Sequence, residues 1–218
     1  MDFGNMIGDS FAYAKDAVFG KWMQWLLLVI ATILLCIPLL GYTLKVLRGE
    51  KPAPEVRDWG VLIVDGIKYF IVSLIWAIPC LIIFFVAIGA GIMAYIGNPA
   101  ALMGAIGTML AGLVIFIIVA IITTILATIG IIRFARTGSM GEAFNFGAIL
   151  STIGKIGWVS YILALIILVI VQFIFALVIA VLAMIPVLGI LIELVFIAPV
   201  SLFEARYLSQ LYDTAGAA

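Results

Sequence analysis

Residues 142–161 read EAFNFGAILSTIGKIGWVSY, a short amphipathic segment that leads directly into a long apolar run. Apolar side chains recur along one helical face, and Asn145, Thr152 and Lys155 avoid that face. Trp158 and Tyr161 stand at the head of the apolar run, where aromatic rings mark the membrane–water interface. The stretch therefore predicts an interfacial helix that runs into a membrane span. Its apolar face comprises Phe146, Ile149, Leu150, Ile153 and Ile156.

The composition of the chain indicates that lipid is its solvent. Of 218 residues, 67% are hydrophobic and 10% are charged, and the mean hydropathy is +1.40. Soluble domains are about 45–50% apolar and about 25% charged. We therefore predict one all-α domain over residues 1–218, a polytopic helical membrane protein. Eleven basic residues balance eleven acidic ones, so net charge gives no indication of a nucleic-acid partner.

Two earlier segments resemble the amphipathic stretch and indicate a weak internal repeat. Each predicted unit has an interfacial amphipathic helix, an apolar arm, a Pro/Gly turn and a second arm ending in Arg or Lys. The chain is thus expected to form three helical hairpins with five to six apolar arms, in units of roughly 1–49, 55–136 and 142–212. The matches that carry this repeat are Glu55, Gly60 and Lys68 with Glu142, Gly147 and Lys155, and Asp9, Phe11, Tyr13 and Trp25 with Glu142, Phe144, Phe146 and Trp158.

Two topologies fit the first unit. If it is a hairpin, all eleven Lys and Arg residues lie on one side of the membrane; if residues 26–44 cross once, Lys15 and Lys21 lie opposite the other nine. The positive-inside rule favours the hairpin and predicts cytoplasmic termini in the plasma membrane. Its arms of roughly 16 and 10 residues, about 24 and 15 Å long, are short enough that the hairpin would be re-entrant.

Two polar residues within apolar arms are the intramembrane candidates. An ionisable group at depth costs about 2.5–3.5 kcal/mol on insertion scales, so Glu193 is expected to face a cavity or a partner. It is either a proton or cation site with Gln172 nearby, or a hydrogen-bonded residue that helps helices to pack.

Other side chains have both a structural and a functional interpretation. Asp65 and Lys68, three residues apart, can pair on one helix face. Gly104, Thr108 and Gly112 form a small-xxx-small ladder for packing within the chain or between copies of it. A group of basic residues would converge on one face, either through topology alone or as a binding surface for anionic lipid headgroups. The group comprises Lys45, Arg48, Lys51, Arg57, Arg133, Arg136 and Lys155.

Three segments together resemble a known family. They are FGNMIGDSFAYAKD (residues 3–16), PLLGYTLKVLRGEKPAPEVRDWGVLIVDGIKYFIVSLIWAIP (38–79) and RFARTGSMGEAFNFGAILSTIGKIGW (133–158). The chain is similar to archaeal and some bacterial integral membrane proteins catalogued as a domain of unknown function, of the DUF4013 kind. Gly41-Tyr42, Asp58-Trp59-Gly60 with Asp65-Gly66, and 142–147 are the most specific parts. The resemblance implies a prokaryotic multi-pass protein and no particular activity.

The sequence favours a role without catalysis. It contains no histidine, no metal-ligand cluster and no nucleophile–base pair, so we predict no catalytic residue, metal or cofactor. Cys36 and Cys80 lie in apolar runs and are interpreted as packing residues. We expect a structural or accessory membrane protein whose partners are lipids and a membrane-protein complex or a second copy. The alternative is a small transporter or channel that uses Glu193.

Overall fold

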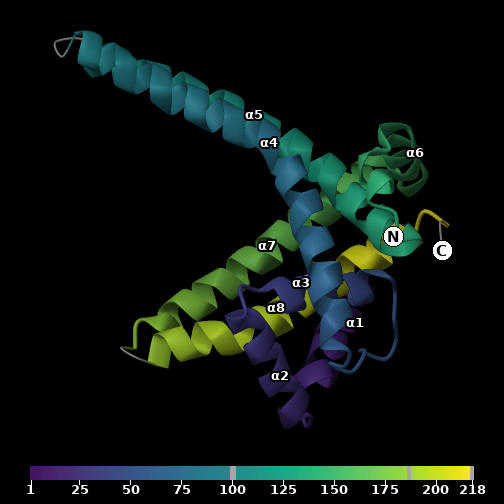
Figure 1. The fold of residues 1–218 in the computed structure, drawn as a ribbon. Helices are drawn as coiled ribbons and strands as arrows, with labels where there is room; N and C mark the ends of the chain where they lie inside the picture. The colour runs from purple at the N-terminus through teal and green to yellow at the C-terminus, as the bar shows by residue number, and fades with distance from the viewer. Residues whose placement is uncertain (99–101, 186–187, 217–218) are drawn as a thin grey trace.

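The computed structural model describes residues 1–98, 102–185 and 188–216, and it folds this part of the chain into helices and their connections (Figure 1). The all-α prediction is confirmed. The turns predicted at 97–99 and 186–189 lie partly outside the described residues. The elements are α1 (Phe3–Val18), α2 (Trp22–Ile33), α3 (Ile37–Leu47), α4 (Trp59–Gly97), α5 (Leu102–Thr137), the short 3₁₀ helix η2 (Met140–Phe144), α6 (Phe146–Ile156), α7 (Trp158–Ala183) and α8 (Leu188–Asp213).

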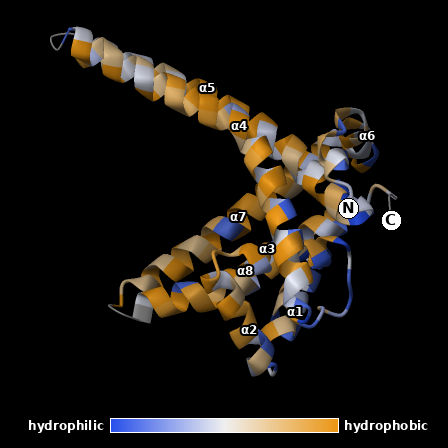
Figure 2. Ribbon diagram, in the orientation of Figure 1, coloured by the Kyte–Doolittle hydropathy of each residue, from blue (hydrophilic) through white to orange (hydrophobic). Residues whose placement is uncertain are grey.

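Two long hairpins dominate the molecule. Helices α4 and α5 pair over the part that extends far from the other elements and separate toward α3 and α6, while α7 and α8 form a shorter hairpin that diverges from them (Figure 1). Both hairpins are apolar along most of their length (Figure 2). Among the described residues, α4, α5 and α7 are long and apolar enough to cross a membrane. These helices support the prediction of a membrane protein.

The first unit is a hairpin whose first arm is shorter than predicted. Helix α2 has 12 residues and α3 has 11, and each is shorter than the about 20 residues that a span needs. Leu35 and Cys36 adopt positive φ angles of 56° and 60° and reverse the chain between the two helices. Helix α1 precedes α2 at a bend of 98°, so α1 and α2 count as one broken span or as a re-entrant segment.

The second unit differs from its prediction because its amphipathic lead-in is continuous with the span. Helix α4 begins at Trp59 and runs to Gly97 without a break. In the third unit, Gly157 has a φ of 90° and separates α6 from α7. The match of Lys68 with Lys155 places Phe70 opposite Gly157. A phenylalanine adopts positive φ only with strain, so the helix continues through this position.

Helices α3 and α4 cross with their backbones in contact. A Cβ atom added at Gly41 would lie 1.9 Å from the carbonyl oxygen of Leu62, and one added at Gly66 would lie 1.8 Å from that of Ile37. Only glycine permits this approach from both sides. The crossing therefore holds the first hairpin against α4. Gly41 and Gly66 both belong to the motifs that carry the family resemblance.

A proline in α8 provides a second connection between the hairpins. Pro199 lacks a backbone N–H, so the carbonyl of Val195, four residues earlier, loses its usual helical donor. The indole Nε1 of Trp25 donates to that carbonyl at 3.0 Å. The helix break is thus satisfied by a side chain from α2, and α2 is held against α8.

Candidate functional site

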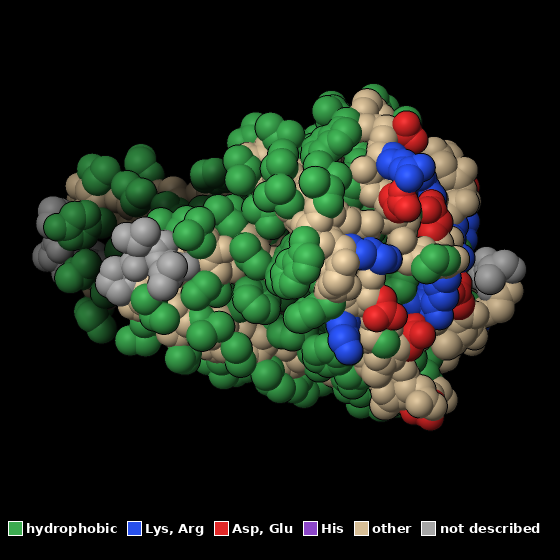
Figure 3. Space-filling view, turned by 90° about the horizontal axis from the view of Figure 1, so that it is seen from below, with side chains coloured by type: hydrophobic (Ala, Val, Ile, Leu, Met, Phe, Trp, Pro, Cys, Tyr) green, Lys and Arg blue, Asp and Glu red, His purple; other side chains and the backbone are tan. Residues whose placement is uncertain are grey.

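Charged side chains gather at one end of the molecule, and hydrophobic side chains cover most of the rest of the face shown in Figure 3. We call this region the polar end. It brings together the C-terminal turns of α3, α5 and α8, the N-terminal half of α4, helix α1 and the loop after α3. The polar end is defined by the ion-paired residues Asp9, Arg48, Lys51, Asp65, Arg136, Arg206 and Asp213.

Two arginines at the polar end each cap the helix from which the other projects. Arg48, at the end of α3, donates through Nε to the carbonyl of Ala135 in α5 at 3.2 Å and pairs with Asp65 at 2.7 Å. Arg136, at the end of α5, donates through Nε to the carbonyl of Leu47 in α3 at 2.8 Å. The last carbonyls of a helix lack intrahelical donors and carry partial negative charge. We call this reciprocal capping the arginine exchange.

Asp9 links α1 to α8 and to the loop after α3. Its carboxylate accepts from Lys51 at 3.2 Å and from Arg206 at 2.8 Å. The guanidinium of Arg206 also lies over the ring of Tyr13, 5.5 Å from its centroid. The Tyr13 hydroxyl in turn donates to the carbonyl of Glu50 at 3.0 Å. These contacts use the charges of the polar end to hold the helices together.

Glu142 has the same structural role beside α6. It pairs with Arg133 of α5 and accepts a further hydrogen bond from the side chain of Asn145 at 3.2 Å. The hydrogen bond from Arg133, followed by that from Asn145, lowers the pKa of the Glu142 carboxyl below its ordinary value. Asn145 also caps α6 by accepting from the backbone N–H of Ala148 at 3.2 Å.

This ion pair predicts a pH-dependent contribution to stability. A carboxyl whose pKa is lower in the folded state stabilises the fold above its unfolded pKa, and the contribution is lost as the pH falls through the folded pKa. Glu142→Gln should therefore lower the melting temperature in detergent at pH 7, and the difference from the wild type should shrink as the pH falls below about 4.3, the ordinary pKa of a glutamate carboxyl. Glu55→Gln, in the exposed pair with Arg57, is the control and should show little difference. A Glu142→Gln difference that is independent of pH would contradict this role.

The predicted basic face divides into paired and open residues. Arg48, Arg133 and Arg136 are engaged in ion pairs with α4, η2 and α8. Asp65 pairs with Arg48 rather than with the predicted Lys68. Lys51 pairs with Asp9. The remaining candidates are accessible to different degrees: Arg57 is exposed and pairs with Glu55, Lys155 is exposed, and Lys45 is half-buried.

The intramembrane candidates lie apart from each other. Glu193 is exposed near the start of α8, close to the hairpin turn. Gln172 of α7 instead donates to the carboxylate of Glu204 at 3.0 Å. Sequence reasoning missed Glu204 because it stands beside charged residues at the end of an apolar run. The signal was its spacing, since Gln172 and Glu204 lie sixteen residues before and after Leu188, at the hairpin turn.

The small-residue ladder of α5 faces two directions. A Cβ atom at Gly112 would lie 2.2 Å from the Cβ of Ala87, so Gly112 packs against α4. At Gly104 an added Cβ would have no neighbour within 4 Å in the described part of the chain. The Thr108 hydroxyl is exposed and donates to the carbonyl of Gly104 at 3.0 Å. Packing within the hairpin thus accounts for Gly112 and leaves the other two positions open.

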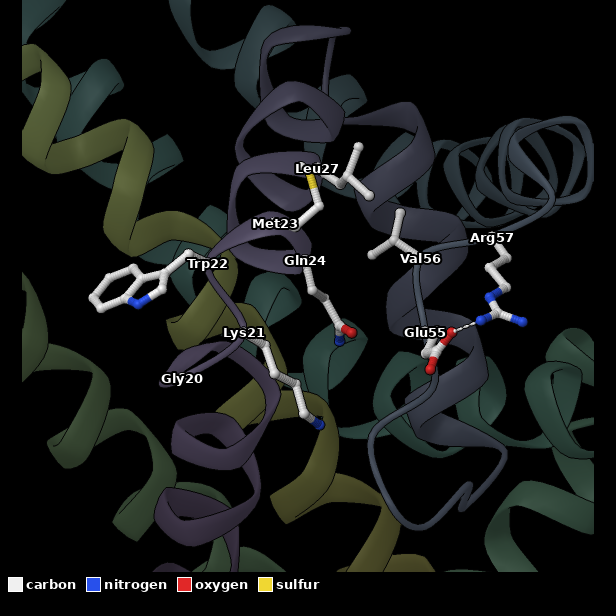
Figure 4. Close-up of a pocket in the computed structure, with 9 residues that line it drawn as sticks. All are labelled: Gly20, Lys21, Trp22, Met23, Gln24, Leu27, Glu55, Val56 and Arg57. Carbon is white, nitrogen blue, oxygen red and sulfur yellow. Dashed lines mark ion pairs between the residues drawn. The ribbon is translucent and has the colours of Figure 1, made fainter.

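A groove of about 630 Å³ lies where α1 bends into α2, beside the loop before α4. Figure 4 shows Lys21 and Gln24 facing Glu55 and Arg57 of that loop, with Trp22 pointing away from it. Gln24 is buried and donates to the carbonyl of Pro54 at 3.2 Å, which fixes the loop against α2. We call this the corner groove; it is lined by Gly20, Lys21, Trp22, Met23, Gln24, Leu27, Glu55, Val56 and Arg57.

The residues of these sites are not arranged as metal ligands. Across residues 1–98, 102–185 and 188–216, no group of three or more His, Cys, Asp or Glu side chains is placed to hold a metal ion. Cys36 and Cys80 are both free thiols.

The chain was compared with protein families, with curated proteins and with solved structures. No curated protein and no solved structure matches the chain. A family model described as "Protein of unknown function (DUF4013)" matches residues 25–184, about three quarters of the chain. That range includes the glycine crossing of α3 and α4, both arginines of the exchange, and the capped η2–α6 segment. The chain therefore belongs to the DUF4013 family, as its sequence motifs predicted.

Proposed function

We propose that the protein is a non-enzymatic, accessory integral membrane protein that binds lipid headgroups in the corner groove and supports a larger membrane complex. The observation that carries this proposal is the composition of the groove. It joins exposed cationic side chains to apolar ones at the first turn of α2, a helix whose outer face is exposed and apolar. A phospholipid has the same division between an anionic headgroup and an apolar chain.

The charges of the groove support binding of an anionic headgroup. Lys21 makes no ion pair among the described residues, and Arg57 pairs only with the exposed Glu55, so both cations are available to a phosphate. Lys21 is also the N-cap of α2 and provides no side-chain cap, so the first N–H groups of that helix are open to an anion. Trp22 and Met23 are 67% and 70% exposed, as suits residues at the headgroup level.

The exposed surface of the α4–α5 hairpin supports the accessory role. Large apolar side chains remain open far from the polar end, including Phe85 at 66%, Ile96 at 67% and Met103 at 79% exposure. In a bilayer, lipid chains and the helices of other proteins can cover such a surface. The polar end, by contrast, uses its buried and half-buried charges to join its own helices.

Lipid binding predicts a specific loss on neutralising the groove. Each basic residue near a membrane surface contributes about 1 kcal/mol of attraction to anionic lipid, so Lys21→Gln with Arg57→Gln should weaken binding of anionic lipid roughly thirtyfold. Native mass spectrometry of the full chain, titrated with phosphatidylglycerol, measures this. Lys15→Gln with Lys155→Gln removes the same charge outside the groove and should retain the affinity. Equal losses in the two variants would show diffuse attraction and contradict a headgroup site.

Purification from native membranes tests the accessory role. A stoichiometric companion complex is the expected result. The competing function, a small transporter or channel, predicts that proteoliposomes of the purified protein move protons or small solutes and that Glu193→Gln abolishes the flux. That outcome would overturn the accessory role.

We also propose that the protein lies in the plasma membrane with both termini in the cytoplasm. The N-terminal helix α1 and the end of α8 meet at the polar end, which holds most of the paired Lys and Arg residues. With Cys36 and Cys80 replaced by alanine, single cysteines at Gly97 and Ser139 should react with a membrane-impermeant maleimide from opposite sides of the membrane. Labelling of both positions from the same side would exclude this topology.

A further inference from the structure

A cavity of about 150 Å³ lies between α3, α4 and α8, away from the corner groove. Its polar lining comes from three helices: Thr43 of α3, Tyr69 of α4, and Ser201 and Glu204 of α8. Leucine and alanine side chains complete the wall. Of the residues that line the cavity, none is Lys or Arg, and Glu204 provides the single charge.

Two of the hydroxyl groups can only accept hydrogen bonds from a ligand in the cavity. The Thr43 hydroxyl donates its proton to the carbonyl of Leu39 at 2.9 Å, and the Ser201 hydroxyl donates to that of Ile197 at 2.9 Å. Each hydroxyl has one proton and two lone pairs. With the proton committed to the helix backbone, only oxygen lone pairs remain for the cavity.

The carboxylate of Glu204 is held in position from outside the cavity. Gln172, on α7, donates to one of its oxygens at 3.0 Å. A carboxylate has about four acceptor sites, so this hydrogen bond leaves most of them free. Glu204 is also exposed at the surface of the chain, so a ligand can reach it without a conformational change. Gln172 is therefore a positioning residue for Glu204.

We propose that this cavity is a binding site for a monovalent alkali cation. Its lining presents a carboxylate and two acceptor-only hydroxyl oxygens, with the Tyr69 hydroxyl able to turn its lone pairs inward, and hard cations prefer such oxygen ligands. An anion would meet the negative charge of Glu204, and the Tyr69 hydroxyl is the one lining group that could donate a hydrogen bond to it. One carboxylate balances one positive charge, which favours a monovalent over a divalent ion. A water occupies about 30 Å³ in the liquid, so the cavity also has room for the ion's remaining waters.

The test is the thermal stability of the purified full chain in nanodiscs at constant ionic strength. A ligand that binds the folded state raises the melting temperature in a saturable manner. We expect Na⁺ or K⁺ to do so relative to N-methylglucamine, a cation too bulky for the cavity. Glu204→Gln should abolish the shift, and Glu193→Gln, the same change on the same helix outside the cavity, should retain it.

A second variant tests the proposal independently, in case Glu204→Gln does not fold. Ser201→Ala removes one neutral oxygen and should weaken the apparent cation affinity roughly tenfold, the worth of one interaction with a charged group. Equal melting temperatures of the wild type in all three cations would overturn the proposal. So would a shift that persists in Glu204→Gln, a stabilisation that depends on pH alone, or one that appears only with lipids bearing a primary ammonium headgroup.

Discussion

Gly66→Ala is expected to destabilise the protein by about 3 kcal/mol or more, at the upper end of what overpacked sites cost. The added Cβ would lie 1.8 Å from the carbonyl oxygen of Ile37, and a backbone atom cannot move aside as the end of a side chain can. Helices α3 and α4 would have to separate, which would also draw Arg48 away from Asp65. Thermal unfolding in detergent, followed by circular dichroism, measures the loss.

Gly60→Ala is the matched control on the same helix. An added Cβ there would have no neighbour within 4 Å among the described residues. Alanine has the higher helix propensity, by up to about 1 kcal/mol, so this variant should be as stable as the wild type or slightly more stable. Gly41→Ala, on the opposite side of the crossing, should resemble Gly66→Ala. If both crossing variants unfold at the wild-type temperature, the backbones of α3 and α4 do not cross in this way.

The architecture was predictable because long apolar runs and their interfacial flanks are local features. The amphipathic stretch 142–161 appears as η2, α6 and the start of α7, with the boundary at Gly157 where a left-handed residue is tolerated. In the second unit the amphipathic segment is continuous with the span in α4, and this too was predictable from the local sequence. A break there would need a glycine, and Phe70 occupies that position. The shortness of α2 was harder to predict, since the chain reverses at Leu35 and Cys36, inside a continuous apolar run.

The pairing of side chains was not predictable from spacing alone. Asp65 was expected to pair with Lys68 three residues away, but the crossing at Gly41 and Gly66 brings Arg48 closer. Gln172 meets Glu204 because the turn of the α7–α8 hairpin sets the register between two helices. Such partners depend on how helices cross, and a single sequence shows only which residues could take part.

Arg136→Met is expected to cost about 2–3 kcal/mol, because methionine keeps the length of the side chain but none of its hydrogen bonds. The change orphans the carbonyl of Leu47 and removes contacts to Ser209 at 2.9 Å and Asp213 at 2.6 Å. The Asp213 side chain is 37% exposed, so water can solvate its carboxylate once the arginine is gone. The expected loss of stability is therefore smaller than for breaking a fully buried ion pair. Arg57→Met, in an exposed pair, should change stability by less than about 0.5 kcal/mol.

The arginine exchange predicts that the losses of stability on substituting Arg48 and Arg136 are not additive. Arg48→Met and Arg136→Met each weaken the same contact between the ends of α3 and α5. The second substitution should therefore cost less stability in the presence of the first than it does alone. A double-mutant cycle by urea or thermal unfolding should therefore give a coupling of about 0.5–3 kcal/mol, the range for residues that share partners. Arg136→Lys should recover only part of the loss, because an ammonium lacks the planar fork that reaches Leu47 and Asp213 together. Additive losses would mean that each arginine caps its neighbour independently, and the exchange would then be two separate caps.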